Sequence, residues 1–293
     1  PRGRTPGDGW RRRETGSCPL PVSARHYPFC RLGPSSGGGH FHGAIEQWQV
    51  VTVSGEYRVM AVSTAVPRPT MIHGHEVLTS IIRSPSPAPL LFGPTGPTDN
   101  RTPVHTGHVL AFSAQHYDHW TRRFGINRSE WDWCYWGENL TIDGLSEDAL
   151  RVGQRLAIGP DAILEVTSPR IPCFKLAWRI GQPDSVLSEI IADGRIGFYL
   201  RVVRTGLIGA GDTVRLSDMD ESSITVGDLS RLLGDPSIED PGLLRAVLAQ
   251  PALGSQAYGL LRKRINLLED RARGSVGRWT GWRDWFHPSR GCL

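Results

Sequence analysis

One segment of the chain combines a cysteine with flanking basic residues: residues 168–176, with the sequence Ser-Pro-Arg-Ile-Pro-Cys-Phe-Lys-Leu. It follows a predicted strand, so we expect Cys173 on a loop at the mouth of a barrel, with Pro172 stiffening the backbone before it. The positive charges of Arg170 and Lys175 favour the thiolate form of Cys173, which attacks electrophiles and binds soft metals. A buried structural thiol is the alternative interpretation.

A second polar segment, residues 137–141, has the sequence Gly-Glu-Asn-Leu-Thr. Side chains two residues apart in a strand share one face, so Asn139 and Thr141 offer hydrogen bonds on the same side. Gly137 lets a ligand or another backbone approach closely. The four aromatic residues just before this segment could stack on a flat ligand, although ordinary core packing is the alternative for each ring: Trp131, Trp133, Tyr135 and Trp136.

Histidines occur in close pairs that resemble parts of a zinc site: His73 and His75, His105 and His108, His116 and His119. The chain contains no HExxH motif, and none of the pairs has a third ligand at a defined spacing. We therefore interpret these histidines as surface residues or members of hydrogen-bond networks.

Strand patterns dominate the middle of the chain. Short β-type runs cover residues 61–63, 76–82, 109–112, 152–159, 162–166, 198–203 and 211–216. Residues 84–97 contain five prolines, which predicts a loop without regular strand pairing. Together the runs predict a mainly β fold with α-helices, built as a small β-barrel with one or two packed helices.

Helical patterns precede and follow this strand-rich part. Ser113 is a candidate N-cap for a helix that ends at Gly125. Three short amphipathic helices are predicted within residues 218–273, with starts near Thr225, Asp240 and Ser255. The predicted organisation is a disordered leader at 1–59 rich in Gly, Pro and Arg, a barrel domain at 60–217, a three-helix domain at 218–273 and a tail at 274–293.

Charge and composition exclude several classes of protein. The formal net charge of +4 lies entirely within residues 1–59, and the remaining chain has 25 basic and 25 acidic residues. A neutral body argues against a nucleic-acid partner. No apolar run approaches the ~18 residues needed to cross a bilayer, so we expect no membrane partner. Five cysteines without a CxxC pair favour a reducing compartment and predict a cytoplasmic location.

Taken in order, several motifs resemble the MOSC family, and specifically its YiiM-type branch with a C-terminal three-helix domain. The resemblance covers about residues 60–217 and rests on residues 104–107, 114–120, 137–141, 152–155, 168–175 and 194–199. It departs from the family pattern at residues 105–108, which are His-Thr-Gly-His where the branch usually has His-Gly-Gly-Pro.

This resemblance implies a β-barrel that holds the molybdenum cofactor, a molybdopterin-bound molybdenum. Cys173 would be the metal ligand and, with Lys175, a catalytic residue. The residues implied to surround the pterin and its phosphate are His105, Asn139, Leu140, Thr141, Arg170, Pro172, Arg195, Gly197 and Tyr199. A thiolate suits molybdenum, and arginine suits a phosphate.

We expect a molybdenum-cofactor-dependent reductase of N-hydroxylated compounds, acting on a small-molecule substrate. An external electron-donor protein is expected, because no flavin or iron–sulfur motif is visible. A homodimer is one assembly that we consider, and the sequence does not identify the oligomeric state. Two alternatives remain: a sulfur carrier or cofactor chaperone with a persulfide on Cys173, and a non-catalytic interaction module that uses the three-helix domain.

Overall fold

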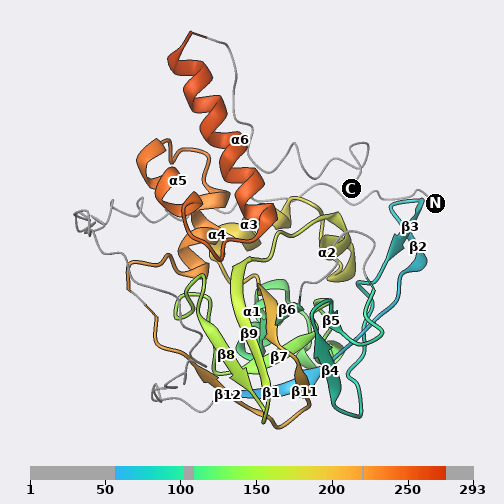
Figure 1. The fold of residues 1–293 in the computed structure, drawn as a ribbon. Coiled ribbons are helices and arrows are strands. Elements are labelled where there is room, and N and C mark those ends of the chain that lie inside the picture. The colour runs from blue at the N-terminus through green and yellow to red at the C-terminus, as the bar shows by residue number, and fades with distance from the viewer. Residues whose placement is uncertain (1–56, 102–108, 220, 275–293) are drawn as a thin grey trace, which may run out of the picture. The chain divides into compact units, whose positions relative to one another are not determined.

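A closed barrel of seven strands forms the centre of the molecule (Figure 1). The computed structural model describes residues 57–101, 109–219 and 221–274, all within one compact unit, Ala44–Leu293. Neighbouring strands follow the order β1-β12-β8-β9-β10-β6-β7, and only β6 and β7 pair in parallel. Their bounds are β1 Tyr57–Val62, β6 Val109–Ser113, β7 Leu140–Asp143, β8 Arg155–Ile158, β9 Ala162–Pro169, β10 Phe198–Arg204 and β12 Thr213–Leu216.

Alternating side chains fill the interior of this barrel. In β8, Leu156 and Ile158 are buried, whereas Arg155 and Ala157, which alternate with them, are partly exposed. Burying one such apolar side chain contributes roughly 1.5–3 kcal/mol. The predicted mainly β class with a barrel and packed helices is therefore confirmed.

Two small sheets lie outside the barrel. One has the order β11-β4-β5 and the other is the hairpin β2–β3, with bounds β2 Arg68–Ile72, β3 His75–Thr79, β4 Leu90–Gly93, β5 Gly96–Pro97 and β11 Gly206–Ile208. The prediction of a loop without strand pairing at 84–97 is wrong. Residues 90–93 lie between Pro89 and Pro94 and contain no proline, so their N–H groups can pair with β11.

Helix α1 (Ala114–Phe124) begins after Ser113 and ends at Gly125, as predicted. Gly125 has a φ of +67°, a conformation that glycine adopts without strain. The Ser113 hydroxyl does not cap the helix; it donates to the Leu145 carbonyl instead, at 2.5 Å. A 3-10 turn, η1 (Arg128–Glu130), follows α1.

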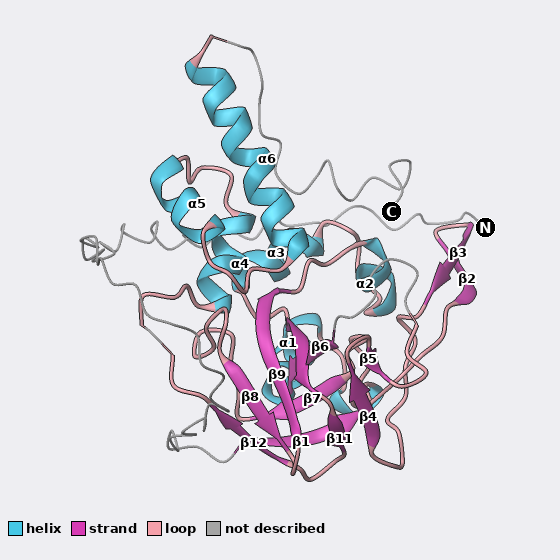
Figure 2. Cartoon of the chain, in the orientation of Figure 1, coloured by secondary structure: helices cyan, strands magenta, loops and turns pink. Residues whose placement is uncertain are grey.

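Helices α2 to α6 follow α1 in the described part of the chain and are drawn in cyan in Figure 2. The three predicted in the C-terminal part are confirmed as α4 (Val226–Gly234), α5 (Pro241–Leu248) and α6 (Ser255–Ala272). Thr225 and Asp240 accept hydrogen bonds from the first turns of α4 and α5, as expected of N-caps. Two were not predicted, α2 (Phe174–Arg179) and α3 (Val186–Asp193). Helix α4 contacts both α3 and β9, which attaches the helical part to the barrel.

Several predictions fall on residues outside the described ones. These are the leader at 1–59, apart from residues 57–59 that begin β1, the tail at 274–293, apart from Gly274, and His105 with its neighbours at 102–108. None of the described helices is long and apolar enough to span a bilayer.

Candidate functional site

Strand pairing places the predicted site residues around one end of the barrel. Val62 of β1 pairs with Leu140 of β7, and Leu140 also pairs with Ala111 of β6. Phe198 of β10 pairs with Ala111 on one side and with Pro169 of β9 on the other. These residues form one rung around part of the barrel. Segments that leave the barrel just beyond this rung are therefore brought together.

Cys173 follows β9 by four residues and is the N-cap residue of α2. Cys173 therefore lies on the loop between β9 and α2, as expected, directly before the helix begins at Phe174. The thiol is reduced and partly exposed, whereas Pro172 before it is buried. Lys175 lies in the first turn of α2, and its Nζ is 5.9 Å from the centre of the Phe174 ring.

Arg170 is buried between the barrel and the aromatic segment. Its backbone N–H donates to the Gly197 carbonyl at 2.8 Å, and its guanidinium donates to the Trp136 carbonyl at 2.6 Å. The residue is only 7% exposed, and neither of these partners is charged. Arg170 is therefore held by neutral groups, which leaves its positive charge for another group.

The Tyr199 hydroxyl is influenced by the charges of both Arg170 and Cys173. Its backbone pairs with Ser168, and its carbonyl accepts from the Thr167 hydroxyl at 3.1 Å. Burial raises the pKa of the Tyr199 hydroxyl, and the positive charge of Arg170 lowers it in part. Cys173 also contributes to raising this pKa, so arginine, tyrosine and thiol lie within electrostatic reach of one another. Tyr199 is protonated near neutral pH and can donate a hydrogen bond.

Arg83, which sequence reasoning missed, completes this group. Its guanidinium donates to Asn100 Oδ1 at 2.9 Å, and its buried Nε has no hydrogen-bond partner among the described residues. Burial lowers the pKa of Arg83 to about 10, and nearby Cys134 and Glu138 oppose this shift. Arg83 directly follows the apolar run at 76–82. The signal that could have pointed to Arg83 is its position, as a single basic residue at the end of a predicted strand.

Asn139 and Thr141 are buried, and their side chains bond to the protein. Asn139 Nδ2 donates to the Ser63 carbonyl and to Asn100 Oδ1, and its Oδ1 accepts from the Leu110 N–H. Asn100 Oδ1 thus receives donors from both Asn139 and Arg83. The structure therefore gives Asn139 a role in holding Arg83. Leu140 points into the barrel core, so only its backbone could face a ligand.

Glu138 is a fully buried carboxyl beside the arginines. Its Oε1 accepts from the Tyr117 hydroxyl at 2.5 Å, from the Thr141 hydroxyl at 2.8 Å and from the Cys134 N–H at 3.1 Å. Its Oε2 is buried without a partner among the described residues. Burial raises the pKa of Glu138, although these donors and the charge of Arg170 lower it in part.

The second described cysteine, Cys134, lies in this network too. It is buried and reduced, and burial raises its thiol pKa to about 12. Cys134 is therefore a neutral thiol near pH 7, and of the two described cysteines Cys173 is the more accessible. This difference supports Cys173 as the chemically useful thiol.

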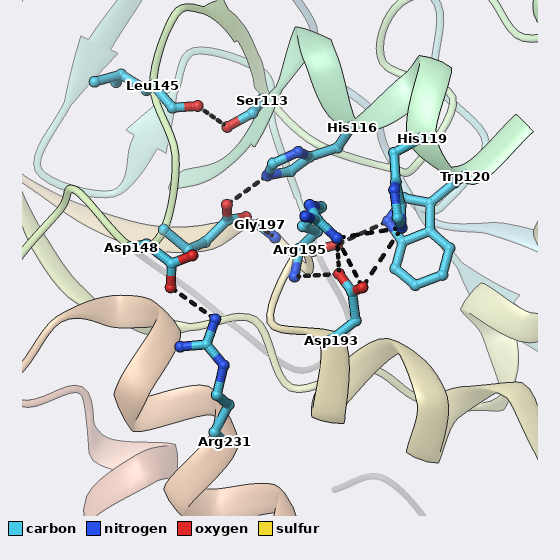
Figure 3. Close-up of polar contacts among 11 residues, drawn as sticks. Ser113, His116, His119, Trp120, Leu145, Asp148, Asp193, Arg195, Gly197 and Arg231 are labelled. Carbon is cyan, nitrogen blue, oxygen red and sulfur yellow. Dashed lines mark hydrogen bonds and ion pairs between the residues drawn. The ribbon is translucent and has the colours of Figure 1, made fainter. Parts of the chain in front are cut away.

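Arg195 and Gly197 were predicted to complete the wall of the site. Gly197 does belong to it, through its bond to Arg170, but the Arg195 guanidinium turns away toward Asp193 at 2.8 Å and His119 at 3.4 Å (Figure 3). His116 is buried and bonds to Glu147 at 2.5 Å. Among the described residues, no three potential metal ligands come together through histidine, cysteine or carboxylates.

Residues 90–215, from β4 to β12, match the family model of the MOSC domain. Residues 90–215 therefore form a MOSC domain. A "Protein YiiM" of Escherichia coli is 26% identical over 60% of this chain and 79% of its own length. The crystal structure of YiiM from Geobacillus stearothermophilus has the same fold, with a TM-score of 0.58 at 23% identity, covering 71% of this chain and 99% of that one. The predicted YiiM-type MOSC resemblance is therefore confirmed.

A fungal protein named "Reductase", from Gibberella moniliformis, is 30% identical over 55% of this chain. This chain spans only 29% of the length of that relative, which therefore contains much that has no counterpart here. MOSC domains are associated with the molybdenum cofactor. Arg83 lies just before the matched range, so it belongs to the site but not to the part of the chain that matches the MOSC model.

Proposed function

We propose that this MOSC protein binds the molybdenum cofactor through Cys173 and acts as a reductase of N-hydroxylated compounds. The observation that carries the proposal is the pair of buried arginines, Arg83 and Arg170, close to Tyr199 and Cys173. Against these two positive charges stands one buried carboxyl, Glu138, whose pKa is raised. An excess of buried positive charge requires an anionic partner, because an unpaired buried charge is costly.

The donor set fits a molybdopterin. A thiolate is a soft ligand for the metal, and arginine is suited to phosphate because it can donate two parallel hydrogen bonds. The Nε of Arg83, which has no partner in the described part of the chain, is an available donor, and Tyr199 can donate from its protonated hydroxyl. Cys173 would hold the metal, and Arg83, Arg170 and Tyr199 would hold the phosphate. When bound, the cofactor supplies two-electron oxygen-transfer chemistry.

The other residues of the site orient these groups. Asn139 holds Asn100, which in turn holds Arg83, and Gly197 holds the backbone of Arg170. Lys175, two residues beyond Cys173 in the first turn of α2, would place a positive charge near the thiolate and would deliver a proton from Nζ as the N–O bond of the substrate is cleaved. Electrons would come from an external donor protein, and a location in the cytoplasm would keep the thiol reduced.

The proposal is tested by an anaerobic assay of the purified protein with an N-hydroxylated base and a chemical electron donor. We expect conversion to the corresponding amine, loss of at least 100-fold in rate for Cys173→Ser, and little change for Cys134→Ser. A protein that carries a persulfide on Cys173 and shows no turnover would contradict the reductase and favour a sulfur carrier.

A further inference from the structure

Glu147 is a buried carboxylate that the proposed chemistry does not use. It lies in the turn after β7, is 2% exposed, and has a partner for each oxygen. Oε2 contacts Nε2 of His116 on α1 at 2.5 Å, and Oε1 accepts from the backbone N–H of Gly197 at 2.7 Å. Figure 3 shows His116 and Gly197 approaching each other from α1 and from the loop before β10.

Gly197 is the residue through which Glu147 contacts the candidate site. Its φ is +84°, and a Cβ at this position would lie 2.7 Å from the Ala111 carbonyl, so the loop packs directly against β6. Its carbonyl accepts from the Arg170 N–H at 2.8 Å. The two following residues of β10 pair with β9, and the second of them is Tyr199. Glu147 thus holds Gly197. Gly197 in turn holds the backbone of Arg170, and it lies two residues before Tyr199.

The turn that presents Glu147 is itself fixed from several sides. The Glu147 carbonyl accepts from the Gly227 N–H of α4 at 3.0 Å, and the Leu145 carbonyl accepts from the Ser113 hydroxyl. Asp148 also forms an ion pair with Arg231 of α4 at 2.8 Å (Figure 3), but this pair is exposed and screened by solvent, so it adds little to the support. A Cβ on Gly227 would lie 2.1 Å from Asp148 Oδ1, so α4 packs closely on this turn. These contacts with α4 and Ser113 therefore fix the position of the turn that carries the Glu147 carboxylate.

We propose that Glu147 is a positioning residue for the cofactor site, acting on Arg170 and Tyr199 through Gly197. This inference rests on the proposed function. It does not require Glu147 to touch the ligand. Removing the carboxylate leaves the Gly197 N–H buried without its acceptor, which is unfavourable and releases the loop.

The test uses Glu147→Ala, Glu147→Gln and, as a neighbouring control, Asp148→Asn, which loses only an exposed ion pair. Glutamine keeps a side-chain oxygen for the Gly197 N–H, so we expect it to rescue the alanine defect. The first readout is hydrogen exchange, followed by mass spectrometry, in peptides that contain Gly197 and Arg170. The second is the pterin retained by the purified protein after gel filtration.

We expect Glu147→Ala to speed exchange at Gly197 and Arg170 at least 10-fold, with α6 unchanged, and to lower retained pterin at least 10-fold. Glu147→Gln and Asp148→Asn should stay within 3-fold of wild type in both readouts. If the alanine variant does not fold, Glu147→Asp serves instead, because it withdraws the oxygens by one methylene, and it should lose pterin in the same way.

Unchanged exchange in Glu147→Ala, or wild-type pterin retention despite faster exchange, would overturn the inference. So would a glutamine variant as defective as alanine, since that result would indicate a role of the negative charge alone. A wild-type protein without pterin would instead contradict the proposed function, and the exchange measurement would still decide whether Glu147 holds Gly197 and Arg170.

Discussion

Two groups of arginines in this molecule differ in what neutralises them. Arg195, which is about half exposed, lies against Asp193 at 2.8 Å, so its charge is matched within the protein. Arg83 and Arg170 are each 7% exposed, and among the described residues their guanidinium groups donate to an amide oxygen and to a backbone carbonyl, respectively. A buried cation held only by neutral acceptors marks a place for an anionic ligand, whereas an exposed and paired cation marks a solvated surface.

The sharpest way to break this comparison is to remove one arginine from each group. Arg83→Met should weaken retention of the pterin about 30-fold to 150-fold, because a hydrogen bond to a charged group contributes roughly 2–3 kcal/mol when buried. Arg195→Met should change it less than 2-fold. Pterin fluorescence after dialysis against graded buffer volumes measures both. Equal losses of pterin in the two variants would show that the buried arginine contributes no more to pterin binding than the exposed one.

A second comparison concerns two glycines with positive φ in one loop. Gly197→Ala should destabilise the protein by about 2 kcal/mol, since φ is +84° and the new Cβ would lie 2.7 Å from a backbone oxygen. Gly194→Ala should cost about 1 kcal/mol, because its nearest neighbour at 3.3 Å is the far end of a long side chain, Arg231, and not backbone. Urea unfolding monitored by tryptophan fluorescence gives both values. A larger loss for Gly194→Ala would contradict the tight packing of Gly197 on β6.

The smallest expected effect is a pH dependence from Glu138. Its pKa in the folded protein is raised above the ordinary value of 4.5 by burial, beside Arg83, Arg170, Tyr117 and Cys134. The folded state therefore binds the proton more tightly than the unfolded chain, and stability falls as pH rises from 4.5 through the raised pKa.

Glu138→Gln mimics the protonated acid and removes this dependence. The wild-type curve of unfolding free energy against pH should be steeper than that of the variant in this window, by at most about 1.4 kcal/mol per pH unit. Parallel curves would show that Glu138 has the same pKa in both states.

Local sequence signals predicted much of this fold. The alternating runs gave most barrel strands. Thr225 and Asp240 marked helix starts because caps are determined by adjacent residues, and Ser113 marked the start of α1 although its hydroxyl does not cap that helix. Pairing of 90–93 with 206–208 joins residues more than a hundred positions apart, and no local signal reports such a partner. Helix α2 was missed for a related reason: it is a single short segment after two prolines, and it forms by packing on α3.

The residues of the candidate site also divide into those that local sequence motifs indicate and those that only the folded structure brings together. Arg170, Cys173 and Tyr199 lie in motifs that the sequence displays. Arg83 does not, because its importance comes from the fold, which buries it beside Arg170. The contact of Arg195 with Asp193, the last residue of α3, is local, but the sequence does not show which way the Arg195 side chain turns.

The central claim is that Cys173, with Arg83 and Arg170, holds a molybdenum cofactor. The most direct test is the molybdenum and pterin content of protein purified from a host that makes molybdopterin, compared with Cys173→Ser and Cys134→Ser. We predict molybdenum and pterin near one per chain in wild type and in Cys134→Ser, and loss of molybdenum in Cys173→Ser. Wild-type protein free of both, or full molybdenum in Cys173→Ser, would contradict the claim.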